Sequence, residues 1–460
     1  MKTKYETFRV RKSLRYSILD GSAYAAMMGL TQNFITPLAL ELKASSFQIA
    51  LLSSVPSFTT AMAQLSAPNL AERAGSRKGF IVPVLLAHAL MFIPILLVPY
   101  LFNVSAVWWL IGFVTISTVL GSITFPPWGS MMADLVPEQL RGRYFGNRNM
   151  IMGFITQVFF YMAGGILTLF SGAIFTGYTL LFVGATVFRL LSLYFLSRQY
   201  EPVQAVSKVK GPNLLTMIRN IGSSNLGKFT LFFALIDFCT LISGPFFSVF
   251  MLRDLQFSYM TFVLVCSASQ LSTLLFMIFW GRRADKWGNL KVIQITSLLV
   301  PLVPILWIFN DNVIYLMAIN VVSGFAWSGF GLAGVNFAYD ASEPENRTKY
   351  LAIFAAIDGL ACCLGALLGG SIVPHLPDLF GYQLHTLFVI SGVLRGLVVL
   401  LLLRKVKEVR NVADVSNWQL IRGRTDNGSE DKPRRRFSFH KKEFEDKDDE
   451  DDNGAEQPPD

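Results

Sequence analysis

The sequence predicts an all-α membrane protein with twelve transmembrane helices in two pseudo-symmetric six-helix bundles. Three observations lead to this prediction: few charged residues, long apolar blocks, and a repeat that relates the two halves. Of the 460 residues, 52% are hydrophobic and only 15% are charged, whereas soluble domains carry roughly 25% charged residues. The composition therefore argues against a soluble protein.

The apolar residues fall into blocks of about 20 residues, the length of helix that crosses the roughly 30 Å hydrocarbon core of a bilayer. Short polar stretches separate these blocks. The predicted spans are residues 16–40, 47–67, 79–101, 105–133, 147–171, 176–198, 228–252, 259–280, 290–309, 313–338, 350–374 and 383–404. The first block contains Asp20 and is followed by no cleavage site of small residues, so we expect a retained span and not a signal peptide.

These blocks divide the chain into two halves. We predict a cytoplasmic N-terminal segment at 1–15, an N-terminal bundle at 16–198, a polar linker at 199–227 and a C-terminal bundle at 228–404. The tail at 405–460 contains a run of acidic residues and is predicted to be disordered.

Lys and Arg residues gather in alternate loops between the spans and mark the cytoplasmic side. We therefore expect both termini in the cytoplasm and the protein in the plasma (inner) membrane. The net charge of +9 then reflects membrane topology, so we expect the lipid bilayer and no nucleic acid as a partner.

The two halves repeat charged residues and a tyrosine at a constant spacing of 206 residues. The repeated residues are Asp134 and Asp340, Arg141 and Arg347, Tyr144 and Tyr350, and Arg189 and Arg395. Because six predicted spans separate equivalent points, the halves are parallel repeats.

Two loops also carry a related motif. Residues 68–78 read PNLAERAGSRK, and residues 281–291 read GRRADKWGNLK. They follow the second and eighth spans and are similar to the Gly-x-Leu-Ala-Asp-Arg-x-Gly-Arg-Arg/Lys signature of the major facilitator superfamily. The first copy has Pro68 for the first Gly and Glu72 for Asp. The resemblance covers residues 10–405 and leaves the subfamily unassigned.

The resemblance implies a secondary transporter that moves a small solute by alternating access, with ion or proton coupling, as a monomer and without a cofactor. It also implies a cytoplasmic gate in the loops, with topology and loop solubility as the alternative explanation of the same charges. The implied gate residues are Glu72, Arg77, Asp134, Arg141, Asp285, Asp340 and Arg347.

Ionisable residues inside predicted spans are costly and suggest a function. We hypothesise the pairs Asp20–Arg189 and Asp237–Arg395, which either hold each bundle together or handle substrate or protons. Asp358 has no acidic counterpart at the spacing of 206 and is the candidate for proton coupling.

In the family, the first, fourth, seventh and tenth helices face the central pathway. The resemblance therefore makes Gln32, Asn33, Trp128, Phe246, Phe247, Trp327 and Asn336 candidates for lining it, with aromatic packing as the alternative. Two consecutive prolines at 126–127 predict a break in the fourth span. Small residues at 163–165 and 365–370 predict close helix packing.

No metal or catalytic constellation is visible, so we expect neither a metal site nor an enzyme. The four cysteines are interpreted as buried apolar residues, and His88 as a packing residue. Two other functions stay open: a drug or metabolite exporter of the same fold, and a transport-inactive membrane sensor or scaffold that uses the tail. Within the family that this sequence resembles, proton-coupled drug antiporters usually carry an Arg in the fourth helix and a Gly-Pro-x-x-Gly-Gly element in the fifth. The fourth block here has no Arg and the fifth has no Pro, which disfavours the exporter.

Overall fold

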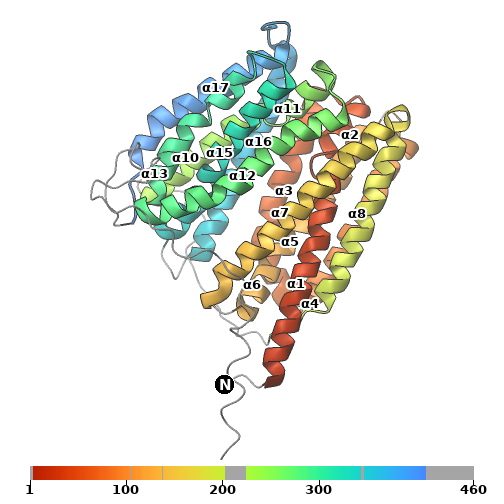
Figure 1. The fold of residues 1–460 in the computed structure, drawn as a ribbon, viewed down its shortest axis with the longest axis vertical. Helices are drawn as coiled ribbons and strands as arrows, with labels where there is room; N and C mark the ends of the chain where they lie inside the picture. Colours follow the sequence, from red (N-terminus) through yellow and green to blue (C-terminus); the bar gives the residue numbers. More distant parts are fainter. Residues whose placement is uncertain (1–3, 104, 137, 203–223, 343–346, 411–460) are drawn as a thin grey trace, which may run out of the picture. The chain divides into compact units, whose positions relative to one another are not determined.

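The computed structural model describes residues 4–103, 105–136, 138–202, 224–342 and 347–410. Its regular elements are helices, apart from one isolated bridge between Leu379 and Tyr382. Most of the predicted linker (203–223) and of the predicted tail (411–460) lie outside the described residues. Figure 1 shows the helices of the first half grouped together, in red to yellow, and those of the second half, in green to blue, beside them.

In the described part of the first half there are eight α-helices and a 3-10 turn at Ser171–Ala173. The α-helices are α1 (Lys4–Thr31), α2 (Ile35–Glu41), α3 (Ser46–Arg73), α4 (Arg77–Leu101), α5 (Ala106–Ile123), α6 (Phe125–Leu135), α7 (Glu138–Leu169) and α8 (Ile174–Ser197).

The second half repeats this order with different interruptions. Its segments are α10 (Asn225–Ser243), α11 (Phe246–Val249), α12 (Tyr259–Trp287), α13 (Asn289–Leu299), α14 (Leu302–Leu306), α15 (Val313–Ala341), α16 (Arg347–Ile372) and α17 (Gln383–Leu402), with a π-helical turn at Phe250–Asp254.

Each predicted span coincides with a helix or an interrupted helix. Among the described residues, ten segments are long and apolar enough to cross a membrane. The other two predicted spans correspond to α1 and α3, which are 28 residues long but less apolar. The mean hydropathy is lowered in α1 by the charged residues of its first half and in α3 by Ser and Thr residues and by the charged end Glu72–Arg73. Ten spans are thus confirmed by length and composition, and two stay predictions.

Several of the interrupted helices break at proline. The predicted break in the fourth span occurs at Thr124, between α5 and α6, directly before Phe125. Helices α10 and α11 separate at Gly244–Pro245, and α13 and α14 at Val300–Pro301. Proline lacks the N–H that would continue the helical ladder, which favours a break at these positions. It does not require one, since α4 continues through Pro83, Pro94 and Pro99.

Glycines allow the helices to approach closely, as predicted. A Cβ added at Gly365 or Gly369 on α16 would collide with the backbone carbonyl oxygen of Phe238 or Ile242 on α10. Only a residue without a side chain fits at such a crossing.

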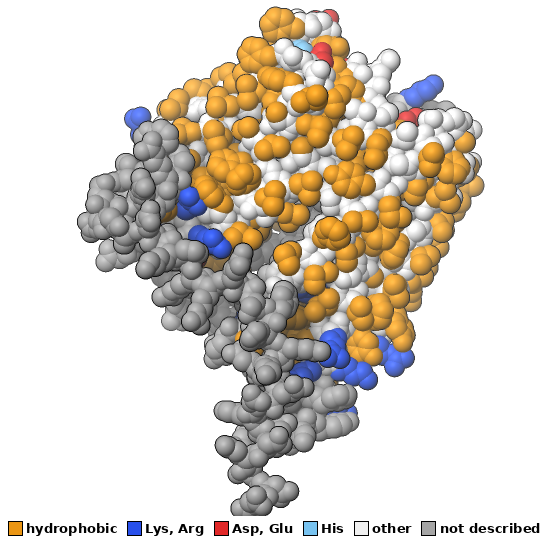
Figure 2. Space-filling view, viewed as in Figure 1, with side chains coloured by type: hydrophobic (Ala, Val, Ile, Leu, Met, Phe, Trp, Pro, Cys, Tyr) orange, Lys and Arg blue, Asp and Glu red, His pale blue; other side chains and the backbone are white. Residues whose placement is uncertain are grey.

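The two bundles contact each other through α3 with α16 and through α7 with α12. We call the end of the helices at which α3, α8, α12 and α17 finish the basic end. At the opposite end, one cluster of buried apolar residues includes members of both bundles, among them Phe34, Phe160 and Phe262. In Figure 2, hydrophobic side chains cover the visible helices, and many of the Lys and Arg side chains gather toward the lower part of the view.

Candidate functional site

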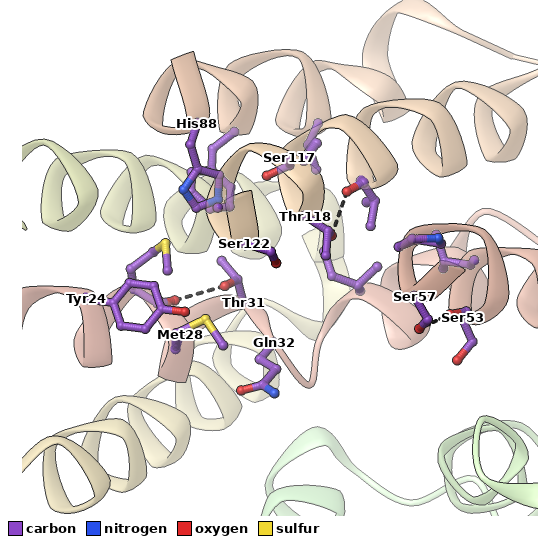
Figure 3. A pocket seen from close by; sticks show the side chains of 18 of the residues that line it. Tyr24, Met28, Thr31, Gln32, Ser53, Ser57, His88, Ser117, Thr118 and Ser122 are labelled. Atoms are coloured by element: carbon purple, nitrogen blue, oxygen red, sulfur yellow. Dashed lines mark hydrogen bonds between the residues drawn. The ribbon is translucent and has the colours of Figure 1, made fainter. Parts of the chain in front are cut away.

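A cavity of about 570 Å³ opens in the first bundle, against α1, α3, α4, α5 and the start of α6. Its volume lies within the range of about 300–1,000 Å³ that is usual for small-molecule sites. Figure 3 shows side chains from these separate helices converging on one space. The polar lining residues are Tyr24, Thr31, Gln32, Thr36, Ser53, Ser57, Gln64, His88, Ser117, Thr118 and Ser122.

The lining of this cavity is polar but contains no Asp, Glu, Lys or Arg among the described residues. Several hydroxyls already donate to their own helix: Thr31 to the Met27 carbonyl at 2.9 Å and Ser57 to the Ser53 carbonyl at 2.7 Å. A hydroxyl that has used its proton keeps lone pairs to accept hydrogen bonds. The cavity therefore suits a neutral molecule that carries hydrogen-bond donors.

His88 connects the cavity to a buried charge, contrary to its interpretation as a packing residue. It lines the cavity, is only 6% exposed, and its Nδ1 accepts a 2.9 Å hydrogen bond from Arg189 Nε. Because Nδ1 is the acceptor, Nε2 carries the proton if the imidazole is neutral. The sequence signal available was a lone histidine within a span, which does not reveal a partner 101 residues away.

A second cavity of about 140 Å³ adjoins the first and shares Tyr24, Gly121 and Phe125 with it. It is lined by three charged residues, Asp20, Arg148 and Arg189, and by Trp128. The charged side chains are 4–7% exposed. The sequence analysis paired Asp20 with Arg189 but did not single out Arg148, although this residue lies at the start of the fifth predicted span (147–171).

The expected direct pair between Asp20 and Arg189 is replaced by a relay. Ser192 Oγ donates to Asp20 at 2.6 Å and lies 3.3 Å from Arg189 Nη1, while Gln199 donates to the other carboxylate oxygen at 3.4 Å. The Arg189 guanidinium lies over the Tyr24 ring, at 4.9 Å from its centroid. Neutral groups, and not the guanidinium, therefore satisfy the carboxylate.

The second expected pair, Asp237–Arg395, is also replaced by other contacts. Arg395 is 2% exposed and donates to Ser391, to Ser243 and to the carbonyls of Val300 and Thr240. Among the described residues it forms no ion pair with a carboxylate. Serine hydroxyls and the backbone carbonyls of Val300 and Thr240 satisfy the guanidinium instead.

Asp237 lies beside Asp358. Ligand atoms of these two carboxylates and of Cys362 lie within 4.8 Å of one another. The Oδ1 atom of Asp358 is buried without a hydrogen-bond partner among the described residues. Asp358 was expected to lack a partner, but the fold brings α10 and α16 together and supplies one.

Two of the pathway candidates line a cavity, and the others do not. Gln32 lines the larger cavity and Trp128 the smaller one. Phe246 is fully buried in the apolar cluster, and Phe247 stacks on Phe388. Trp327 packs edge-on against Phe330; Asn33 and Asn336 are partly buried, and neither lines these two cavities. Phe246 is therefore a packing residue in this structure.

At the basic end, Arg77 is the centre of the first cluster. Its Nη1 lies 2.7 Å from Asp134 and 3.0 Å from the Ser130 hydroxyl, and its side chain is 3% exposed. Glu201, just after α8, accepts from the Ser76 hydroxyl at 2.6 Å and from the backbone N–H of Arg77 at 2.8 Å. Burial raises the pKa of Glu201, but these hydrogen bonds outweigh it and hold the pKa below its ordinary value. The segment after α8 thus caps the start of α4.

At the basic end of the second bundle, other residues make the corresponding contacts. Glu408, after α17, accepts from the Leu290 N–H at 2.7 Å, and Arg410 lies 2.7 Å from Asp340 and 3.9 Å from Asp285. The hydrogen bond to Asp340 raises the pKa of Arg410. The sequence analysis expected Arg347 as the partner and missed Arg410, which has no counterpart in the repeat.

These two clusters are each formed within one bundle. Arg141 bonds back to the carbonyls of Ala133 and Val136 at the end of α6. The side chains of Glu72 and Arg347 lie outside the described residues. The cytoplasmic gate therefore stays a proposal.

Comparisons with known proteins agree with this architecture. The family profile of the Major Facilitator Superfamily matches residues 21–239 and again 229–439. A mutant of the nucleoside transporter NupG aligns with a TM-score of 0.70 at 16% identity, covering 86% of this chain and 100% of that one. An auto-inhibited POT family peptide transporter aligns at 0.66 and 12%, covering 89% and 99%.

A bacterial homologue of the human lysosomal transporter Spinster, in an inward-facing and occupied conformation, aligns at 0.61 and 14%, covering 88% and 98%. In sequence, a class H tetracycline resistance protein from Pasteurella multocida is 24% identical over 124 residues, which span 26% of this chain and 31% of that protein. At these identities, the structural likenesses establish the fold.

Proposed function

The chain belongs to the Major Facilitator Superfamily, and from this premise we propose that it is a secondary transporter that moves a small, neutral, polar solute across a membrane by alternating access. The cavity of about 570 Å³ carries this proposal. Its hydroxyl and amide lining matches a solute with several hydrogen-bond donors and acceptors, because each unpaired buried polar group would otherwise oppose binding. Nucleosides have this chemistry, which is consistent with the likeness to NupG.

Alternating access is supported by where the two bundles are joined. Among the described residues, the hydrogen bonds between bundles lie in the half of the helices away from the basic end. They are Tyr259 to Glu41, Tyr178 to Tyr259, Met260 N–H to Thr168, and Gln157 to Ser267. This arrangement corresponds to a carrier closed at the opposite end and accessible from the basic end. Rocking of the bundles would then exchange the open side.

The pair Asp237–Asp358 is the proposed site of proton coupling. Two carboxylates this close in a membrane interior repel each other, so that one proton or cation held between them is favourable. The carboxyls lie on α10 and α16, so their protonation state can affect the packing of the second bundle.

We place the basic end in the cytoplasm of a plasma (inner) membrane, with both termini inside. The support is the alternation of Lys and Arg along the loops, which follows the positive-inside rule. The cavity in this structure is then reached from the cytoplasm.

Binding is tested by thermal unfolding of the purified protein against nucleosides, neutral sugars and charged metabolites, since a ligand that binds the folded state raises the melting temperature. We expect neutral, hydroxyl-bearing solutes to stabilise the protein. Ser57→Phe fills the cavity and should abolish the shift. Ser371→Phe is the matched control, because Ser371 makes the same hydrogen bond within its helix but lies outside the cavity. Stabilisation that survives Ser57→Phe, or that only charged metabolites produce, contradicts the proposal.

Coupling is tested in proteoliposomes with a solute identified in this way. Asp358→Asn should abolish uptake driven by a pH gradient and keep exchange of labelled for unlabelled solute. Uptake by Asp358→Asn that still follows the pH gradient contradicts the assignment.

A second candidate is an exporter of drugs or metabolites, favoured by the partial match to a tetracycline resistance protein. The same proteoliposomes separate the two: an importer accumulates solute together with protons, whereas an exporter exchanges solute against them. A transport-inactive sensor would instead lose its output when the chain is cut after Arg410, where a carrier would keep its flux.

A further inference from the structure

The smaller cavity holds more buried positive charge than buried negative charge. Arg148 and Arg189 both line it, and Asp20 is the only carboxylate among the described residues of its lining. Asp20 interacts electrostatically with both guanidiniums, but it can neutralise only one of them. One positive charge therefore lacks a counter-charge within the lining.

Neither guanidinium is engaged by a carboxylate at ion-pair distance in the part of the chain that the structure describes. Arg148 Nε donates to the Ser17 carbonyl at 3.2 Å, and its guanidinium lies 4.6 Å from the centroid of the Trp128 ring. Arg189 donates to His88 and Ser192. These partners are all neutral. An unpaired charge buried away from water costs several kcal/mol, so a counterion is favoured.

Trp128 adds a donor without an acceptor. Its indole Nε1–H is buried and has no hydrogen-bond partner among the described residues, and its ring lines the same cavity. An indole N–H can only donate. An acceptor placed beside Arg148 and Trp128 would satisfy both with a small adjustment of the side chains.

We propose that this cavity is a binding site for a small anion, attracted by the guanidiniums of Arg148 and Arg189 in its lining. Its volume of about 140 Å³ holds chloride, acetate or phosphate with a few water molecules, given about 30 Å³ per water. It is too small for a whole solute. The site does not depend on the proposed transport function.

Two sources share this chemistry. The anion is either a free ion, such as chloride, or the carboxylate or phosphate of a larger molecule whose body occupies the adjoining cavity. In the second case the solute of the larger cavity is anionic, and the neutral solute of the proposed function is replaced. The second source is geometrically available because the two cavities share Tyr24, Gly121 and Phe125.

The test is thermal unfolding of the purified full-length protein at constant sodium concentration, with gluconate replaced stepwise by chloride, acetate, butyrate or phosphate. We expect a saturable rise in melting temperature for the wild type. Arg148→Gln should raise the half-saturating concentration by at least tenfold. Arg253→Gln, which alters an exposed arginine paired with Asp254, is the control and should leave it unchanged.

Asp20→Asn should change the anion affinity in the opposite direction to Arg148→Gln. It removes the one negative charge of the lining, and its amide can donate to Gln199 Oε1, which now lacks a partner. Anion binding should therefore become at least tenfold tighter, whereas a merely structural role of Asp20 would weaken it or leave it unchanged. If Arg148→Gln does not fold, Trp128→Phe takes its place, and we expect weaker binding from loss of the indole N–H.

The anions distinguish the source. A shift with chloride or phosphate alone assigns a free ion. A shift that grows from acetate to butyrate assigns the anionic group of an organic molecule that extends into the larger cavity. The proposal is overturned if no anion stabilises the wild type beyond gluconate, or if Arg148→Gln responds like the wild type.

Discussion

Glu201 offers a direct measure of how strongly the segment after α8 holds the first bundle together. Its carboxylate accepts from the Ser76 hydroxyl at 2.6 Å and from the N–H groups of Arg77 at 2.8 Å and Lys78 at 3.4 Å. Its side chain is 21% exposed. We consider the substitution Glu201→Gln, which keeps one oxygen and the shape but removes the charge.

The magnitude follows from the two short bonds. Hydrogen bonds to charged groups contribute roughly 1.5–3 kcal/mol and neutral ones roughly 0.5–1.5. Loss of charge therefore costs about 1 kcal/mol for each short bond, or about 2 kcal/mol together. At 2–4 °C per kcal/mol, which applies to domains of roughly 150–250 residues, the apparent melting temperature should fall by about 4–8 °C.

The sign of the pH dependence is determined by the lowered pKa of Glu201, whose ordinary value is 4.5. Because the pKa is lower in the folded state, the stabilisation is complete above pH 4.5 and is lost as the pH falls through the folded-state value. The difference between wild type and Glu201→Gln should be full at pH 7 and should shrink below pH 4.5.

The assay is thermal unfolding in detergent, followed by tryptophan fluorescence between pH 3.5 and pH 7. Glu408→Gln is the matched variant in the second bundle. The Glu408 carboxylate accepts from the N–H groups of Leu290 at 2.7 Å, Val409 at 2.9 Å and Arg410 at 3.2 Å, so we expect a loss of similar size. Equal melting temperatures of wild type and Glu201→Gln at pH 7, or a difference that does not change with pH, would refute the reasoning.

Three further outcomes are expected. Gly369→Ala should cost about 1–3 kcal/mol by overpacking against α10, measured by unfolding, whereas Gly165→Ala has open space and should cost less than 1 kcal/mol. Tyr259→Phe removes the hydrogen bond to Glu41, worth about 1.5–3 kcal/mol. The rate at which a thiol reagent added at the opposite end modifies the cysteines of the protein should rise by about tenfold or more, and an unchanged rate contradicts this. Arg410→Gln removes the ion pair with Asp340 and should destabilise the protein by only about 1 kcal/mol, because the arginine side chain is partly exposed. An equal melting temperature would show that its ion pairs contribute nothing.

Most of the fold was predictable because it follows from local properties. Blocks of apolar residues placed the spans, and the consecutive prolines at 126–127 predicted the break found at Thr124. The close packing of Gly365 and Gly369 followed from the run of small residues. Each of these features depends on neighbouring residues or on helix geometry alone.

The site was less predictable because its contacts join distant parts of the chain. Both predicted acid–arginine pairs were replaced: Ser192 stands between Asp20 and Arg189, and Asp237 lies beside Asp358 instead of pairing with Arg395. The spacing of 206 residues showed that Arg189 and Arg395 are related by the repeat, but a repeat does not specify a rotamer or a partner on another helix.

The sequence by itself determined a membrane chain of two parallel repeats, the position of its helices and the list of charges inside them. These depend on hydropathy and spacing, which are linear properties of a chain. Only the tertiary structure decided which charges meet. It placed Arg148 and Arg189 in the lining of one small cavity and, among the described residues, left the Trp128 indole without an acceptor. The reason is that crossings of separate helices determine side-chain neighbours, and no pattern along one helix records them.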